Sequence, residues 1–445
     1  QFCSSSIPHA RVSLFVDVMY ALFWVTQHIR RPLGAHFRLR QPVQARFHTS
    51  SVTKGKSLPQ LQRRSQRLRA FLRKLKWPRL THVSLQGHEV KLPAAHANLQ
   101  LLNVAQPSID YLAGFFDGDG YVQVSKKKSV LLSIGQSSRQ ADVLLSFVHA
   151  FGGSLHVHGE GRGVKWPTVV WTVSGLSARS AARLLAPACA VKRQQLEIVA
   201  HWPQCKDLRT QLQAELGRLK RVSPDCGFTC NWSYIAGFFD AEGCIRMTPT
   251  SSKPSVHVGQ KYEAVLEVIR SFVRNEIPDM KMSLHRSGNR ASVLVCYGRN
   301  AHSLLTNMFI HLISKKKQCE MALSPAACPS SLRHHLSAAS GNQSRYSRLD
   351  LDGEARARSI GRLRSRIRYA VSCGRHESLK RLNSDLEQLR SDHRSGNERT
   401  RVEQYRADIR RLLASGATVL RGCESIPPCF IQTQISRGIL RFKKK

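Results

Sequence analysis

The sequence contains one segment twice. Residues 111–122 read YLAGFFDGDGYV, and residues 234–245 read YIAGFFDAEGCI, at an offset of 123 positions (234 minus 111). Both copies keep an aromatic start, an Ala-Gly step, Phe-Phe, an Asp, and a second acid before glycine. The further pairs of similar segments, whose ends lie 123 or 124 positions apart, are SVLLSIGQ (129–136) with SVHVGQ (255–260), and VKRQQLE (191–197) with SKKKQCE (314–320). The duplication requires a fold built from two copies of one unit.

The repeated segment reads as a helix that ends on two acids. Ser108 is the expected N-cap of the first copy, and the glycines of residues 117–120 end its helix because glycine disfavours helical structure. Carboxylates at a helix C-terminus face the negative end of the helix dipole, which costs a few tenths to about 1 kcal/mol. We therefore expect a positive partner near these acids. A surface turn rich in Asp and Gly is the alternative for a single copy.

Each repeat has the same coarse order of elements, namely helix, strand, strand, helix, strand, strand, helix. Residues 121–125 alternate apolar and polar side chains, and residues 139–151 have helical spacing. This pattern predicts an α+β fold in which each repeat supplies a curved antiparallel sheet with helices on one face. The other face stays open.

The open faces carry the candidate nucleic-acid contacts. Side chains alternate across a sheet, so the polar members of the predicted strands share the open side. Gln and Arg can form paired hydrogen bonds with base edges, while phosphate contacts position the protein. The expected DNA-binding residues are Gln123, Ser125, Ser133, Arg246, Thr248, Ser255 and His257.

The charge of the chain indicates a nucleic-acid partner. Lys and Arg number 69 against 29 Asp and Glu, which gives a formal net charge of +40 and a pI of about 10.6. An excess of this size is typical of proteins that bind nucleic acid. A membrane surface would also attract it, but no apolar run reaches the length of about 18 residues that a span needs. We expect no membrane partner, and a monomer.

The N-terminal region has the composition of an organellar targeting segment. From Met19 to His88 there is no Asp or Glu, while arginines recur and Ser and Thr follow. This composition predicts a mitochondrial transit peptide within about residues 1–50, with a plastid as the alternative destination. Leu14 to Val25 could also be read as the apolar part of a secretory signal, but the arginines after it argue against that reading. The residues before Met19 are expected to be an extension or untranslated.

The C-terminal region predicts a helical hairpin. Leu379, Leu382, Leu386 and Leu389 have amphipathic helical spacing. We expect a break at Ser391–Glu398, after which the apolar pattern resumes in a second helix. The arginines of this hairpin could contact DNA or RNA, although a solvated face is the simpler interpretation.

The two motifs resemble the paired LAGLIDADG motifs of single-chain homing endonucleases, and the resemblance covers about residues 107–325. It implies two pseudo-symmetric αββαββα repeats with saddle-shaped antiparallel sheets, to which this chain adds a helical C-terminal extension. The expected divisions are a targeting segment (1–50), a basic helical arm or linker (51–106), the first repeat (107–202), a linker (203–229), the second repeat (230–325) and a basic helical extension (326–445).

The resemblance also implies roles for individual residues. Asp119 and Glu242 would bind Mg²⁺ or another divalent cation, in agreement with the preference of hard cations for carboxylate oxygen. Asp117 and Asp240 would shape the turn instead. The residues expected to position water and stabilise charge are Lys192, Lys315, Gln136 and Gln260. The small residues expected where the two motif helices meet are Ala113, Gly114, Ala236 and Gly237.

These expectations lead to two candidate functions. The first is a site-specific DNA endonuclease that makes a metal-dependent staggered double-strand break at a long site. The second is an organellar maturase of the same fold, which binds intron RNA and assists splicing without cleaving DNA. The presence of both acids, both lysines and both glutamines favours the enzyme, whereas the targeting segment and basic extension favour the maturase.

Overall fold

The computed structural model describes residues 57–100, 102, 106–224, 227–247, 253–287, 291–324, 332–333, 335–336 and 351–419. The chain divides into two compact units, residues 1–54 and residues 55–445. All described residues belong to the second unit. The expected targeting segment and Thr248 lie outside the described residues.

The first repeat follows the expected order of elements. Its elements are α4 (Ile109–Asp119), β5 (Gly120–Val124), β6 (Val130–Ser137), α5 (Asp142–Phe151), β7 (Ser154–Gly159), β8 (Thr168–Ser174), α6 (Gly175–Leu185), the short helix η2 (Ala186–Ala188) and α7 (Arg193–Ala200). Ser108 caps α4, since its side-chain oxygen accepts a hydrogen bond of 3.3 Å from the Tyr111 N–H. A helix, α8 (Lys206–Leu219), occupies much of the expected linker.

The second repeat repeats this order. Its elements are α9 (Trp232–Glu242), β9 (Gly243–Arg246), β10 (Ser255–Gln260), α10 (Glu263–Glu276), β11 (Met282–Ser287), β12 (Ala291–Tyr297), α11 (Gly298–Met308), η3 (Phe309–His311) and α12 (Lys316–Leu323). Asn231 caps α9 as Ser108 caps α4, by accepting a bond of 2.9 Å from the Tyr234 N–H. The expected α+β fold with two αββαββα repeats is confirmed, and each repeat adds a short final helix.

The segment before the first repeat is more than a basic helix. Among its described residues are α2 (Leu58–Lys74), β1 (Leu75–Lys76), β2 (His82–Leu85), β3 (His88–Lys91), β4 (Ala94–Ala95) and α3 (His96–Leu99). Strands β2 and β3 form a hairpin, and β4 pairs antiparallel with β7. Apolar side chains of this segment, including Val83, Leu85 and Leu99, are buried in the same core as the first repeat. The structure therefore joins residues 82–99 to the first repeat, since their alternate apolar side chains need a surface to cover them.

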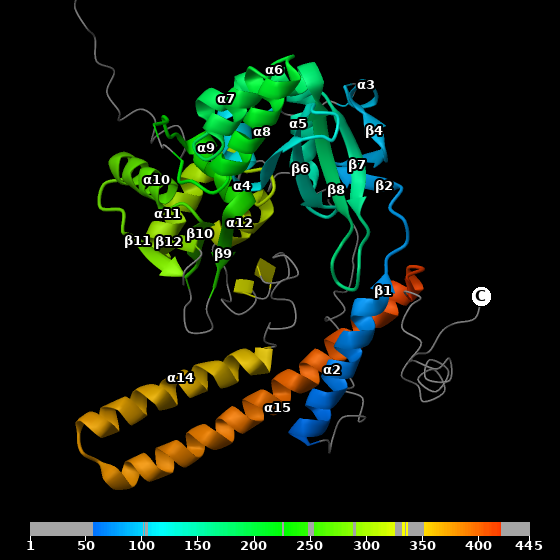
Figure 1. The fold of residues 1–445 in the computed structure, drawn as a ribbon. Helices are drawn as coiled ribbons and strands as arrows, with labels where there is room; N and C mark the ends of the chain where they lie inside the picture. The colour runs from blue at the N-terminus through cyan, green and yellow to red at the C-terminus, as the bar shows by residue number, and fades with distance from the viewer. Residues whose placement is uncertain are drawn as a thin grey trace, which may run out of the picture. The chain divides into compact units, whose positions relative to one another are not determined.

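Both repeats build antiparallel sheets with one buried face. The first sheet has the strand order β4-β7-β8-β6-β5 and the second has the order β11-β12-β10-β9. In the first sheet Val122 pairs with Leu132, and both are buried, whereas Gln123 on the other face is exposed. Helices α5 and α6 contact the first sheet, and α10 and α11 contact the second (Figure 1). The alternation predicted from the sequence thus separates a core face from an open face.

The C-terminal region forms a hairpin of α14 (Leu351–Ser372) and α15 (His376–Ala414), followed by β13 (Thr418–Val419) (Figure 1). The expected break at Ser391–Glu398 is wrong, because α15 continues through it without interruption. Gly396 lies within this stretch, at a point where α15 packs closely against α14. A Cβ at this position would lie 2.5 Å from a guanidinium nitrogen of Arg356 on α14. Close packing of the two helices therefore replaces the break that local propensity predicts.

No helix in the described part of the chain combines the length and the apolar character that crossing a membrane would require.

Candidate active site

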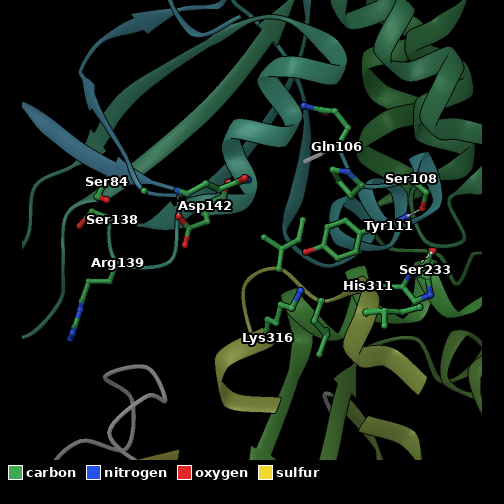
Figure 2. Close-up of a pocket in the computed structure, with 16 residues that line it drawn as sticks. Ser84, Gln106, Ser108, Tyr111, Ser138, Arg139, Asp142, Ser233, His311 and Lys316 are labelled. Carbon is green, nitrogen blue, oxygen red and sulfur yellow. Dashed lines mark hydrogen bonds between the residues drawn. The ribbon is translucent and has the colours of Figure 1, made fainter. Parts of the chain in front are cut away.

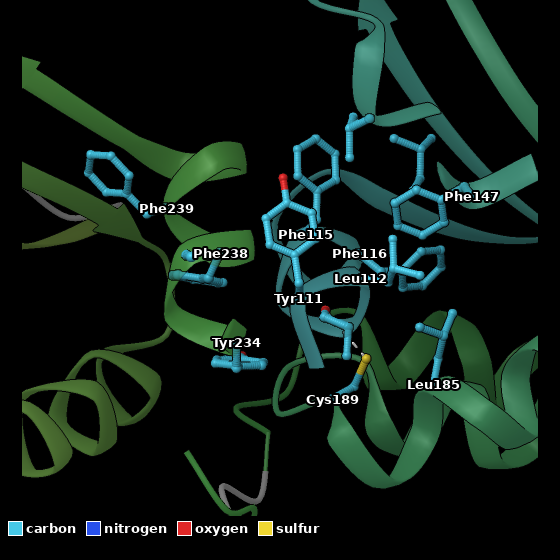
Figure 3. Packing of buried hydrophobic residues seen from close by; sticks show 14 of the residues in the cluster. Tyr111, Leu112, Phe115, Phe116, Phe147, Leu185, Cys189, Tyr234, Phe238 and Phe239 are labelled. Carbon is cyan, nitrogen blue, oxygen red and sulfur yellow. Dashed lines mark hydrogen bonds between the residues drawn. The ribbon is translucent and has the colours of Figure 1, made fainter. Parts of the chain in front are cut away.

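The two motif helices, α4 and α9, meet at a glycine from each. A Cβ on Gly114 would lie 2.1 Å from the Tyr234 carbonyl oxygen, and a Cβ on Gly237 would lie 1.9 Å from the Tyr111 carbonyl oxygen. The neighbouring Ala113 is fully buried, as is Ala236 in the other helix. Figure 3 shows α4 between α9 on one side and the side chains of Phe147 and Leu185 on the other. The residues expected at the interface thus lie there. The two helices can approach closely because Gly114 and Gly237 have no side chain beyond hydrogen.

The same interface explains a difference between the two motif copies. Gly118 of the first copy faces Ala241, its counterpart in the second, and a Cβ on Gly118 would lie 2.3 Å from the Ala241 Cβ. Two carbon atoms cannot approach so closely. The interface has room for one methyl group at this level, so one copy reads Asp-Gly and the other reads Asp-Ala.

The first acid of each motif organises the loop before the repeat's last helix. The Asp117 carboxylate accepts hydrogen bonds from the backbone N–H groups of Ala190, Val191 and Lys192, at 2.6, 3.0 and 2.8 Å. It also accepts a bond of 2.9 Å from the Tyr234 hydroxyl across the interface. Asp117 is buried, and these four donors satisfy a charge that would otherwise be costly to bury.

Asp240 repeats this arrangement in the second repeat. Its carboxylate accepts three backbone bonds of 2.8 Å from Ile313, Ser314 and Lys315, and one of 2.6 Å from the Tyr111 hydroxyl. The sequence interpretation assigned Asp117 and Asp240 to their own turn. The structure instead shows them binding the loops that precede α7 and α12, more than 70 residues away.

The second acids, Asp119 and Glu242, end the two motif helices and have accessible side chains. Gln136 at the end of β6 donates a hydrogen bond of 2.6 Å to the Asp119 carboxylate. Burial raises the pKa of both Asp119 and Glu242. The nearby charge of Asp119 raises the pKa of Glu242 further. The two carboxylates are therefore close enough for the charge of Asp119 to disfavour the ionised form of Glu242.

Lys192 and Lys315 supply the positive charge that the acids require. The Lys192 Nζ donates to the carbonyl oxygens of Phe116, at 2.9 Å, and of Asp117, in the last turn of α4. The Lys315 Nζ donates to the Asp240 carbonyl in the last turn of α9. The Phe116 carbonyl also accepts the N–H of the C-cap residue Gly120, and a cation at this end of a helix is attracted to the negative end of the helix dipole. Burial lowers the pKa of both lysines, while the nearby carboxylates act in the opposite direction.

The two glutamines are placed differently. Gln136 contacts Asp119, as described above, whereas the side-chain oxygen of Gln260 accepts a bond of 2.6 Å from the N–H of the next residue, Lys261. Gln260 is buried at the end of β10. The structure thus brings together five of the six expected catalytic residues and leaves Gln260 turned to its own backbone.

The donor set fits a hard divalent cation. The charge of Asp119 raises the cost of ionising Glu242, and a cation between the two would neutralise both carboxylates. Among the described residues, no group of three or more His, Cys, Asp or Glu side chains is arranged to hold a metal ion. Mg²⁺ in nucleic-acid enzymes is commonly bound by one or two carboxylates, with water and substrate phosphates as the other ligands. Asp119 and Glu242 match that chemistry.

The open faces present fewer of the expected DNA contacts than the sequence predicts. Gln123 and Arg246 are exposed. Ser133 and Ser255 are only 8% and 6% exposed. The Ser125 hydroxyl accepts a bond of 3.1 Å from the Ser129 N–H and so shapes the turn between β5 and β6.

A histidine and an arginine meet on the open face of the second sheet. His257 is half-buried, and its ring lies 3.0 Å from the Ser255 hydroxyl. Burial lowers the pKa of His257, and the charges of Arg246 and His285 lower it further. His285 shares this face because it pairs with Val293 in the same register that places His257 opposite Val295. It belongs to a strand that the sequence interpretation did not search for contacts.

Other residues of the site also escaped the sequence interpretation. Tyr111 and Tyr234 hold the first acids across the interface, and their identical positions in both copies were an available signal. Lys220, just after α8, lies 4.0 Å from the centre of the exposed Tyr121 ring and donates a bond of 2.8 Å to the Val122 carbonyl. Its own carbonyl accepts a bond of 2.9 Å from Tyr262 of the second repeat. No local pattern distinguishes Lys220 from the other lysines of the chain.

A hollow of about 930 Å³ lies near the N-terminal end of α4. Figure 2 shows residues of its lining, among them Tyr111, Ser233 and His311, and the Ser233 hydroxyl lies 3.0 Å from a ring nitrogen of His311. Neither Asp119 nor Glu242 lines this hollow. The carboxylates are instead accessible at the opposite end of the motif helices, next to the open faces, as a long polymeric substrate requires.

These features define a single-chain protein of two pseudo-symmetric repeats that meet at paired, acid-ended helices. Residues 107–149, which span α4 to most of α5, match the family described as a LAGLIDADG-like domain. This match covers the first of the two motifs, and the second motif repeats its residues 123 positions later.

Several solved structures of LAGLIDADG homing endonucleases and meganucleases are similar to the chain. The LAGLIDADG homing endonuclease I-GzeII, in complex with its DNA target, has 13% identity over 52% of this chain and 97% of that chain, with a TM-score of 0.37. The meganuclease I-SmaMI, bound to uncleaveable DNA, has 12% identity over 52% and 92%, with a TM-score of 0.38. The homing endonuclease I-CvuI, in complex with its target, has 24% identity over 30% and 89%, with a TM-score of 0.22. No curated protein matches the sequence.

Proposed function

We propose that this protein is a DNA endonuclease that makes a metal-dependent staggered double-strand break at a long recognition site. The observation that carries the proposal is the pair of accessible carboxylates, Asp119 and Glu242, at the ends of two helices related by pseudo-symmetry. Each helix end also holds a lysine that the same repeat supplies. A duplicated centre suits a duplex substrate, because its two strands each need one phosphodiester bond hydrolysed.

The residues of the site have distinct roles in this proposal. Asp119 and Glu242 would hold the cation, which supplies Lewis-acid chemistry and lowers the pKa of a bound water when present. Gln136 fixes the orientation of the Asp119 carboxylate through its hydrogen bond. Lys192 and Lys315 place positive charge beside the carboxylates, where it can stabilise charge that develops on a phosphate.

The open faces and the charge of the chain support a DNA substrate. Exposed Gln123 and Arg246 lie on the open faces of the sheets, and both residue types can read base edges in a major groove. The net charge of +40 favours contact with phosphates along the duplex. The match of residues 107–149 to a LAGLIDADG-like domain points to the same substrate.

Cleavage of a randomised duplex library tests the proposal. The purified protein is incubated with the library and Mg²⁺, and the new ends are sequenced. We expect paired ends with one constant overhang within a shared sequence. The variants Asp119→Asn and Glu242→Gln should yield no such ends, while Glu197→Gln, an amide change on the exposed face of α7, should cleave as the unchanged protein does. The absence of Mg²⁺-dependent ends from the unchanged protein would overturn the proposal.

A maturase is the second candidate, and one observation favours it. The chain adds a helical region rich in arginine to the two repeats, and structured RNA binds such surfaces through its phosphates. Competition between DNA and RNA separates the two functions, as set out in the Discussion.

We also propose that the protein acts in mitochondria. The support is the absence of acids and the spacing of arginines from Met19 to His88. Residues 1–50 fused to a fluorescent reporter should direct it to mitochondria. A reporter that enters plastids would indicate the alternative destination, and one that stays in the cytosol would remove the proposal.

A further inference from the structure

The N-terminal helix α2 and the C-terminal helix α15 form one structural module. Leu72 and Leu75 are buried against Tyr405, Ile409 and Leu412 in a small core of their own. Strands β1 and β13 pair antiparallel beside this core. The Ser65 hydroxyl donates a bond of 2.9 Å to the buried Glu398 carboxylate, although the two residues are 333 positions apart. We call residues 57–76 together with residues 351–419 the basic module.

Helix α2 is positively charged from Arg63 to its C-terminal end. The helix contains no acid, and its side chains at positions 61, 65 and 72 point into the contact with α15. Its exposed cations are Arg63, Arg67, Arg69 and Arg73. At 100° per residue Arg63 and Arg67 lie on the side of the helix away from the buried side chains, whereas Arg69 and Arg73 lie beside the contact with α15, where their charges act on Tyr405. None of them forms an ion pair with a described residue.

Two further arginines are half-buried where α2 meets α15. Arg64 of α2 and Arg406 of α15 are close enough for the charge of Arg64 to lower the pKa of Arg406, and burial lowers the pKa of both. The Arg406 Nε is buried without a hydrogen-bond partner among the described residues. Arg406 has lost water and faces the like charges of Arg64 and Arg410 as well as the opposite charge of Glu403. A phosphate at the mouth of this contact would offset the repulsion among the arginines.

The basic module is attached to the turn between β7 and β8 of the first sheet. The Trp77 N–H donates to the Gly161 carbonyl at 2.9 Å, and the Trp77 indole N–H donates to the Gly163 carbonyl at 2.7 Å. The Gly163 N–H in turn donates to the Leu75 carbonyl at 2.8 Å. The module therefore shares a direct contact with the sheet whose open face is the candidate DNA surface.

We propose that the basic module binds the phosphate backbone of duplex DNA outside the segment that the two sheets read. This rests on the proposed function. The exposed arginines of α2 and the half-buried pair Arg64 and Arg406 supply the contacts. Helix α2 has 17 residues and is therefore about 25 Å long, the length of roughly 7 base pairs at 3.4 Å each, so its contacts require duplex beyond the segment that lies on the sheets.

Salt dependence of binding to duplexes of two lengths tests the proposal. The probes are generic duplexes of about 20 and about 40 base pairs, and the logarithm of affinity falls with the logarithm of salt by about 0.9 for each phosphate contact. The variant carries Arg63→Gln, Arg67→Gln and Arg73→Gln. We expect its slope to be shallower by up to about 3 on the long duplex and unchanged on the short one. Metal is left out, so that the readout does not depend on cleavage.

Two control proteins accompany this variant. The first replaces the same three arginines with lysine, which keeps the charge, and should retain the slope of the unchanged protein. The second carries Lys91→Gln, Arg183→Gln and Lys206→Gln, which remove three exposed cations from β3, α6 and α8. It should leave the difference between the two duplex lengths unaltered. Circular dichroism melting checks that all variants fold.

Three results would overturn the inference. They are an equal loss on both duplex lengths, an equal loss in the second control, and a greater loss on a structured RNA than on the long duplex. The last result would identify RNA as the partner of the module. If the long duplex binds through the module and the short duplex does not bind at all, the proposal that the two sheets read DNA is wrong, whereas the inference about the basic module stands.

Discussion

The hydroxyl of Tyr111 on the first motif helix donates a hydrogen bond of 2.6 Å to the buried carboxylate of Asp240 on the second. Tyr234 and Asp117 form the reciprocal bond at 2.9 Å. Burial and the facing carboxylate raise the pKa of both tyrosines well above the ordinary value, so each remains a hydrogen-bond donor. Each repeat thus supplies a hydrogen-bond donor to the buried carboxylate of the other repeat.

Replacing Tyr111 with phenylalanine should destabilise the protein. The change leaves the ring in place but removes a donor from a buried charged acceptor, which costs about 1.5–3 kcal/mol in the free energy of unfolding. Urea denaturation followed by circular dichroism measures this loss. Tyr121→Phe is the matched control, because that ring is 49% exposed and should unfold as the unchanged protein does. Equal urea midpoints of unfolding for both variants would contradict the proposed contribution of this hydrogen bond to stability.

Alanine at Gly114 or Gly237 should separate the motif helices. The new methyl group would lie about 2 Å from a backbone carbonyl oxygen, which cannot rotate away as a side chain can. We expect each variant to lose at least about 1–3 kcal/mol of unfolding free energy. Gly217→Ala, in the exposed part of α8 with open space around it, should instead gain up to about 1 kcal/mol from helix propensity. Thermal melting distinguishes these opposite signs.

The facing pair Gly118 and Ala241 should accept an exchange. Gly118→Ala alone brings two methyl carbons to 2.3 Å and should destabilise the interface. Adding Ala241→Gly restores the space for one methyl group, so the double variant should recover, with a coupling energy of about 0.5–3 kcal/mol. A double-mutant cycle by urea denaturation measures it. Additive effects of the two changes would show that the two positions do not share this space.

Stabilisation by Mg²⁺ should depend on pH through Asp119 and Glu242. Their folded-state pKa values are raised, so their contribution to stability without metal is present at low pH and is lost as the pH rises through those values. A divalent cation binds the ionised forms and reverses this trend. The rise in melting temperature on adding Mg²⁺ should therefore be small in acid and grow toward neutral pH.

The amide variants provide the control for this experiment. Asp119→Asn should abolish the response to Mg²⁺. In the absence of metal at neutral pH it should melt no lower than the unchanged protein, because it removes the repulsion that raises the pKa of Glu242. An undiminished response in both Asp119→Asn and Glu242→Gln would place the metal elsewhere.

Competition between nucleic acids should separate the endonuclease from the maturase. Near physiological salt, a selected duplex of about 20 base pairs should outcompete structured intron RNA, because base readout survives where non-specific phosphate binding weakens. Arg246→Ala and Gln123→Ala should each lower the ratio by about 1–3 kcal/mol. Arg183→Ala, on α6, should leave it unchanged. If RNA wins and the first two variants leave the ratio unaltered, the protein is better described as a maturase.

The sequence by itself determined the features that depend on neighbouring residues. The ends of the motif helices at Asp119 and Glu242 and the alternation along β5 and β9 follow from spacing within about a dozen positions, and the duplication follows from direct comparison of two segments 123 positions apart. Such patterns report which side of an element is buried and where it must stop. They were sufficient to predict two αββαββα repeats and to identify the acids at the end of each motif.

Only the tertiary structure decided the relationships between distant residues. The bonds of Asp117 and Asp240 to loops 73 to 75 positions away, the exclusion of a methyl group at Gly118, and the pairing of α2 with α15 leave no local signal. Local propensity also placed a break at Ser391–Glu398, where packing against α14 and α2 keeps α15 continuous. The physical reason is the same in each case. Close packing and buried charge are satisfied between elements, so their partners are chosen by the fold and not by sequence spacing.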